Sequence, residues 1–152
     1  MVVNDSKHAV RSLRDRILVS DEAEQCIAVM LDLSSDSNDV RVNSFIFLNE
    51  SRGVSTSKNG IRIPAKVLIA LVKTCKLYGA GLALIHTHPN EDVTVSFSGE
   101  DMAFFHSLCE RFDQLYPDGL FVFGVINSKS QRYVVNKKDI LSIEWREEQI
   151  CQ

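Results

Sequence analysis

The sequence has little glycine and proline, with seven Gly and three Pro among 152 residues. This scarcity excludes collagen-like chains and the Pro/Gly-rich disordered class. No apolar run approaches the roughly 20 residues that a transmembrane helix needs, and the N-terminal residues lack the apolar stretch of a secretory signal. We therefore expect a soluble, cytoplasmic protein with no membrane partner.

The sequence also has no excess of positive charge: it contains 17 Lys and Arg and 20 Asp and Glu, which gives a formal net charge of −3. Without a global basic field, the chain is a poor candidate for binding nucleic acid. No C-x-x-C pair is present, which argues against a cysteine zinc site. We expect reduced and mostly buried thiols at the four widely spaced cysteines, which are Cys26, Cys75, Cys109 and Cys151.

The chain length suits one domain, which we expect to cover residues 1–152. Helical periodicity predicts helices over residues 6–18, 64–79 and about 99–116. Apolar runs of strand length predict strands over residues 26–33, 40–48, 81–85, 120–126 and 131–135. Residues 49–60 are predicted to form an exposed loop, and residues 138–150 fit either a strand or a helix. This order predicts an α/β (α+β) fold in which helices flank a mixed sheet in three layers.

Two histidines stand at the exit of a buried strand, His86 and His88. Residues i and i+2 of a strand point to the same side, so both imidazoles can face one point. Asp101 follows in the first turn of the next predicted helix. Two imidazoles and one carboxylate with an open fourth position would form a catalytic Zn²⁺ site, although the same donors also suit Fe²⁺.

Simpler interpretations exist for each part of this pattern. An isolated His-x-His is common, and Ser98-Gly-Glu-Asp101 fits a helix N-cap with an acidic first turn. The combination favours a shared metal, because a buried strand does not ordinarily end in two imidazoles without a common partner. His8 and His106 lack this context and are predicted to lie on the surface.

Together, His86-Thr-His88-Pro89 and Ser98-Gly-Glu-Asp101 resemble the JAMM signature of the JAB/MPN-domain metallopeptidases. The resemblance covers about residues 17–136 and includes the order of the predicted elements. It implies the JAB/MPN fold, a three-layer, cytidine-deaminase-like arrangement. It also implies one zinc ion held by His86, His88 and Asp101. The spacer before Ser98 is about two residues longer than the common form, and the glycines usual after the family's upstream glutamate are missing.

The family places a catalytic glutamate at the start of an early buried strand. Glu24, which leads into the strand from Cys26, matches that place, and Glu22 is the fallback on the same side of the chain. The resemblance implies that Glu24 is the general base and then the general acid. It implies that Ser98 donates a hydrogen bond to the oxyanion. No cysteine is assigned a nucleophilic role.

For substrates, the resemblance implies an isopeptidase or peptidase that cleaves after the C-terminal Gly of a ubiquitin-like protein. Small bacterial-type members of this family act beside E1- and E2-like proteins, in antiphage defence or in sulfur-carrier pathways. A metal-free binding scaffold of the same fold and a nucleic-acid-processing module are the alternatives. A zinc deaminase is disfavoured because its His-x-Glu and Pro-Cys-x-x-Cys elements are absent.

Overall fold

A computed structural model describes residues 1–19, 23–33, 39–57, 60–88 and 94–148 of the chain. Its helices are α1 (Ala9–Val19), α2 (Ala65–Tyr78), α3 (Gly99–Leu115) and the short 3₁₀ helix η1 (Glu50–Arg52). Its strands are β1 (Val2–Asp5), β2 (Cys26–Leu33), β3 (Asp39–Leu48), β4 (Ser55–Ser57), β5 (Gly60–Arg62), β6 (Gly81–Thr87), β7 (Phe121–Ile126), β8 (Gln131–Val135) and β9 (Glu144–Glu147).

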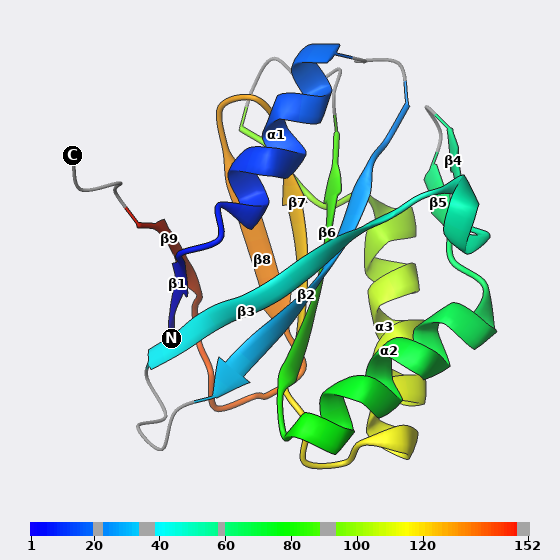
Figure 1. Ribbon diagram of the computed structural model, residues 1–152, viewed down its shortest axis with the longest axis vertical. Coiled ribbons are helices and arrows are strands. Elements are labelled where there is room, and N and C mark those ends of the chain that lie inside the picture. The colour runs from blue at the N-terminus through cyan, green and yellow to red at the C-terminus, as the bar shows by residue number, and fades with distance from the viewer. Residues whose placement is uncertain (20–22, 34–38, 58–59, 89–93, 149–152) are drawn as a thin grey trace.

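Seven of these strands form one sheet in the order β8-β7-β6-β2-β3-β1-β9, while β4 and β5 pair separately. The sheet is mixed: β2 runs antiparallel to both β3 and β6, whereas β6 and β7 are parallel. Helix α1 lies against one face, and α2 and α3 lie against the other (Figure 1). The predicted class, an α/β (α+β) fold with helices flanking a mixed sheet, is confirmed.

Both faces of the central strands are buried, and this explains their continuous apolar sequences. Along β2, Ile27, Val29 and Leu31 pack into the core under α1. The alternate residues Cys26 and Ala28 pack into the core under α2 and α3. The two-residue period of a strand thus supplies both cores from one segment. Within β2, Met30 is partly exposed and the last two residues, Asp32 and Leu33, are exposed.

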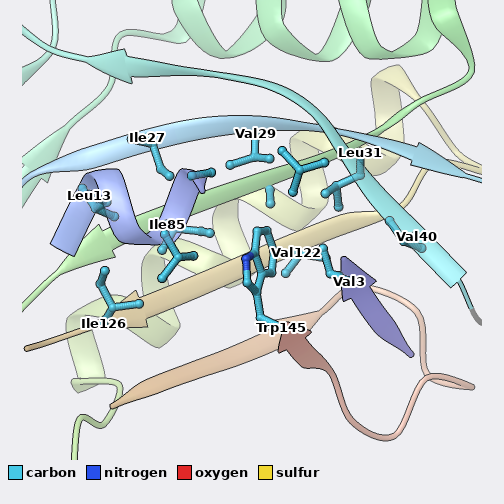
Figure 2. Close-up of a cluster of buried hydrophobic side chains, with 14 of the residues drawn as sticks. Val3, Leu13, Ile27, Val29, Leu31, Val40, Ile85, Val122, Ile126 and Trp145 are labelled. Carbon is cyan, nitrogen blue, oxygen red and sulfur yellow. The ribbon is translucent and has the colours of Figure 1, made fainter. Parts of the chain in front are cut away.

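The sheet curls so that its two end strands meet. Tyr133 on β8 stacks on Trp145 of β9 with ring centroids 5.1 Å apart, and the Gln131 side chain donates to the Trp145 carbonyl at 3.3 Å. Figure 2 shows Trp145 turned inward among the apolar side chains that this curl encloses. The buried Asp5 carboxylate joins the layers here, because it accepts from the backbone N–H of Ala9 and from the Trp145 indole, each at 2.9 Å.

Sequence patterns did not predict the strands at the two ends of the described chain. β1 was not predicted at all, and residues 138–150, left open between strand and helix, contain β9. Both strands are four residues long, too short for periodicity to stand out, and they form by parallel pairing with each other. The predicted loop over residues 49–60 contains η1 and the β4 strand, and β5 begins at its end.

Helix α2 ends at Gly79, whose left-handed conformation (φ 64°) allows its N–H to reach the carbonyls of the last turn, as predicted. Among the described helices, none has both the length and the apolar character required to cross a membrane.

Candidate metal centre

The site lies where β6 leaves the sheet. His86 is the penultimate residue of β6, and His88 follows its last residue. The backbone N–H of His88 donates to the Ile126 carbonyl at the end of β7, at 2.9 Å. The two rings face the same side with centroids 5.0 Å apart. Strand parity and the neighbouring parallel strand therefore hold both imidazoles at one edge of the site.

Asp101 is placed by the N-terminus of α3. The Ser98 hydroxyl accepts from the Asp101 backbone N–H at 3.0 Å, and the Asp101 carboxylate accepts from the Ser98 backbone N–H at 2.9 Å. This reciprocal pair is a capping box, which begins the helix and fixes the Asp101 rotamer. The helix-cap interpretation of Ser-x-x-Asp is thus confirmed, and the same cap turns the carboxylate toward the histidines.

The three side chains converge. Oδ1 of Asp101 lies 3.1 Å from Nε2 of His86, and Oδ2 lies 3.1 Å from Nε2 of His88. One ligand atom from each residue can be chosen so that all lie within 4.8 Å of one another. The sequence-predicted grouping of His86, His88 and Asp101 is therefore present in the structure, and the group could hold a metal ion.

The electrostatics of the triad favour an anionic Asp101. Burial alone would raise the pKa of its carboxyl, but hydrogen bonds from His86, His88 and the Ser98 backbone outweigh burial and hold the pKa well below its usual range. A carboxyl whose pKa is lowered in this way favours its anionic form, which is suited to hold a cation.

Glu24 stands beside the triad and not within it. Its Oε1 lies 3.8 Å from His88 Nε2, and its side chain is 14% exposed. Burial raises the pKa of Glu24, and the neighbouring His86 and His88 only partly offset this rise. A carboxyl whose pKa is moved toward neutrality is suited to exchange protons, which distinguishes it chemically from Asp101.

Ser98 is exposed at the start of α3, whereas the Asp101 side chain is only 14% exposed. The Ser98 hydroxyl oxygen accepts the capping bond, and a hydroxyl that accepts one hydrogen bond can still donate another. The cap and the predicted donor role are therefore compatible.

The donor set fits a transition-metal ion such as Zn²⁺. Two imidazoles and a carboxylate are ligands that zinc accepts in catalytic sites with three protein ligands. Nδ1 of His86 is buried and has no hydrogen-bond partner among the described residues, which is uncommon for a buried ring nitrogen. That ring stacks on Phe123 with centroids 5.1 Å apart, so this stacking and the Nε2 contact with Asp101 orient it.

A cavity of about 240 Å³ adjoins the triad. Besides Glu24, His86, Ser98 and Asp101, it is lined mainly by apolar residues of β2, β5, β6, β7, α3 and the segment after β5, namely Cys26, Ile61, Ile63, Leu84, Phe104 and Phe123. No sequence signal identified Phe123 or Ile61 as site residues, because an apolar strand position looks the same beside a site as in a core.

The remaining predicted residues are placed as follows. His106 is exposed as predicted, whereas His8 is only partly exposed and pairs with Glu147 at 2.9 Å. Cys26, Cys75 and Cys109 are free thiols, and the first two are buried. Burial raises the pKa of Cys26 to about 12, so this thiol stays protonated beside the site. The fallback base Glu22, Pro89 and Cys151 lie outside the described residues.

Comparison with known families finds no family model that matches the chain, and comparison with curated proteins finds no match. Among solved structures, the chain is similar to the solution structure of protein DSY2949 from Desulfitobacterium hafniense, a structural-genomics target. The similarity has a TM-score of 0.56 at 17% identity and covers 97% of this chain and 94% of that one. It extends over nearly the whole length of both chains and concerns the fold alone.

Proposed function

We propose that this protein is a zinc-dependent peptidase or isopeptidase of the JAB/MPN (JAMM) type. It cleaves after the C-terminal Gly of a ubiquitin-like protein, either removing that protein from its conjugates or processing its precursor. The observation that carries the proposal is the convergence of His86, His88 and Asp101, whose ligand atoms lie within 4.8 Å of one another. Beside them, Oε1 of Glu24 lies 3.8 Å from Nε2 of His88. A three-ligand metal group with a separate, largely buried carboxyl beside it is what metal-assisted hydrolysis of an amide requires.

In this proposal His86, His88 and Asp101 hold the zinc ion. Zinc would supply Lewis acidity at the scissile carbonyl and lower the pKa of a water molecule toward about 7. The choice of zinc is supported by the donor set. The choice of the JAB/MPN fold is supported by the order of the helices and strands and by the place of the His-Thr-His and Ser-x-x-Asp segments, at the end of β6 and the start of α3.

The protein's own groups then perform the proton transfers. The Glu24 carboxylate accepts the proton of the attacking water and returns it to the departing amine, so the same group serves as base and acid. The Ser98 hydroxyl donates to the oxygen of the tetrahedral species, where negative charge develops. Neither step forms a bond between substrate and protein, which agrees with a protonated Cys26 thiol in the cavity wall.

The proposed setting is a bacterial pathway of ubiquitin-like conjugation, with E1- and E2-like proteins as partners and antiphage defence as one such pathway. Processing of a sulfur-carrier protein is the related alternative, since it uses the same bond after a C-terminal Gly.

The decisive experiment incubates the purified protein with ubiquitin-like fusions and isopeptide conjugates, and identifies the products by mass spectrometry. We expect cleavage after the terminal Gly, its loss on treatment with a strong chelator, its recovery on adding Zn²⁺, and no inhibition by iodoacetamide. Cleavage of linear fusions alone would assign precursor processing. Binding of a ubiquitin-like protein with no cleavage by the zinc-loaded protein would instead favour the non-catalytic scaffold.

A further inference from the structure

A hydroxyl inside the His-Thr-His segment makes a contact that metal binding does not require. Thr87 is fully buried, and strand parity directs its side chain to the face opposite the two imidazoles. Its Oγ1 accepts a hydrogen bond from the backbone N–H of Gln25 at 2.8 Å. In the other direction, the backbone N–H of Thr87 donates to the Gln25 carbonyl at 2.9 Å.

This arrangement replaces one bond of a regular antiparallel ladder. Cys26 and His86 are register partners of β2 and β6, so Gln25 and Thr87 form the next pair. In a hydrogen-bonded antiparallel pair, each residue donates its N–H to the other's carbonyl. Here the Thr87 hydroxyl receives the N–H of Gln25, at the point where the next residue, His88, bonds to Ile126 of β7.

We infer that Thr87 is a positioning residue for Glu24, because its hydroxyl anchors the peptide group that joins Glu24 to Gln25. The N–H that the hydroxyl binds lies in the same rigid plane as the Glu24 carbonyl and Cα. Together with the bond from Thr87 N–H to the Gln25 carbonyl, this anchor determines the position of the Glu24 Cα, from which the side chain extends. The carboxylate at the end of that side chain lies 3.8 Å from Nε2 of His88. The inference rests on the proposed function, in which Glu24 is the general base.

Thr87 thereby sets the distance between the proton-transfer group and the metal ligands. The anchor joins the start of β2 to the end of β6, which lie side by side (Figure 1). Since a misplacement of about 1 Å in a reacting group lowers rates by about a hundredfold, loss of this single acceptor would reduce turnover while the metal ligands keep their own hydrogen bonds.

The test uses the full chain with the variants Thr87→Val and Thr87→Ser. Valine has nearly the shape of threonine and no acceptor, whereas serine keeps the oxygen. Thr74→Val is the matched control, because it removes a threonine hydroxyl that donates to the Ala70 carbonyl at 2.8 Å from an exposed position of α2. Three quantities are measured: zinc affinity by chelator competition, kcat and KM on a cleavable ubiquitin-like fusion, and hydrogen exchange of the Gln25 amide in the zinc-free protein.

For Thr87→Val we expect kcat to fall about tenfold to a hundredfold, with KM and zinc affinity near wild type and faster exchange at Gln25. Thr87→Ser should restore kcat and the protection of Gln25, and Thr74→Val should change none of these values. The inference is overturned if Thr87→Val keeps wild-type kcat, or if its zinc affinity falls as much as kcat, because Thr87 would then act through the histidines.

Failure of the proposed function has a different signature. The zinc-loaded wild-type protein would then hydrolyse no fusion or conjugate. The exchange comparison at Gln25 would still decide whether the Thr87 hydroxyl anchors this peptide group: equal exchange in wild type and Thr87→Val refutes the anchor.

Discussion

Cys26 and His86 are register partners on the antiparallel strands β2 and β6. This pairing determines which residues meet at the site, because each step away from it in one strand is matched by a step in the other. Gln25 and Thr87 continue the contact between the two strands by one residue, and just beyond them the side chains of Glu24 and His88 approach to 3.8 Å. A carboxyl and an imidazole that are distant in sequence thus become neighbours because each flanks the end of one of two paired strands.

Replacement of Asp101 by alanine should abolish stoichiometric zinc binding, because the ligand that contacts both histidines is lost. Metal content after dialysis, measured by elemental analysis, checks this. Asp113→Ala on the same helix is the matched control and should retain zinc, since Asp113 bonds to Asn136 and not to the site. One zinc per chain in Asp101→Ala would show that the ligand assignment is wrong.

The variant Glu24→Gln should bind zinc as tightly as wild type and lose about 10²–10⁴ in kcat, because an amide cannot accept and return the proton. Steady-state kinetics with the zinc-loaded proteins measure this. Glu22→Gln, made in parallel, should remain active. If Glu22→Gln lost activity and Glu24→Gln kept it, the general base would be Glu22.

Removal of the Ser98 hydroxyl should affect both chemistry and folding. In Ser98→Ala we expect kcat to fall by about 10²–10³ through loss of an oxyanion donor, together with about 1 kcal/mol of stability through loss of the helix cap. Ser98→Thr keeps the hydroxyl and should stay near wild type in both. A decrease in thermal stability at unchanged kcat would show that Ser98 acts only as a helix cap.

The closure of the sheet can be tested independently of any activity. Trp145→Phe retains a ring to stack on Tyr133 but removes the indole N–H that donates to Asp5 at 2.9 Å. The free energy of unfolding, measured in urea, should fall by about 1.5–3 kcal/mol, as for a buried hydrogen bond to a carboxylate. Glu147→Gln weakens only the surface pair with His8 and should cost less than about 1 kcal/mol. Equal losses of unfolding free energy in the two variants would show that the Trp145–Asp5 hydrogen bond does not stabilise the fold more than a surface pair does.

Much of the fold followed from local pattern. The central strands could be predicted because both of their faces are buried, which makes β2, β6 and β7 continuous apolar runs. Helix α2 could be bounded by its apolar stripe and Gly79. β1 and β9 could not be predicted, because four-residue strands carry too little periodicity and depend on a partner from the far end of the chain.

The candidate site, like the fold, could be predicted from the sequence only in part. The sequence by itself determined the grouping of His86 and His88, since alternation along one strand places them on one side, and it placed Asp101 in the first turn of a capped helix. Only the tertiary structure decided that Asp101 reaches both rings, that Glu24 lies beside them, that Phe123 stacks under His86 and that Thr87 binds the Gln25 amide. The physical reason is that alternation and capping act over a few neighbouring residues, whereas these contacts depend on sheet register and on the packing of α3 against the sheet.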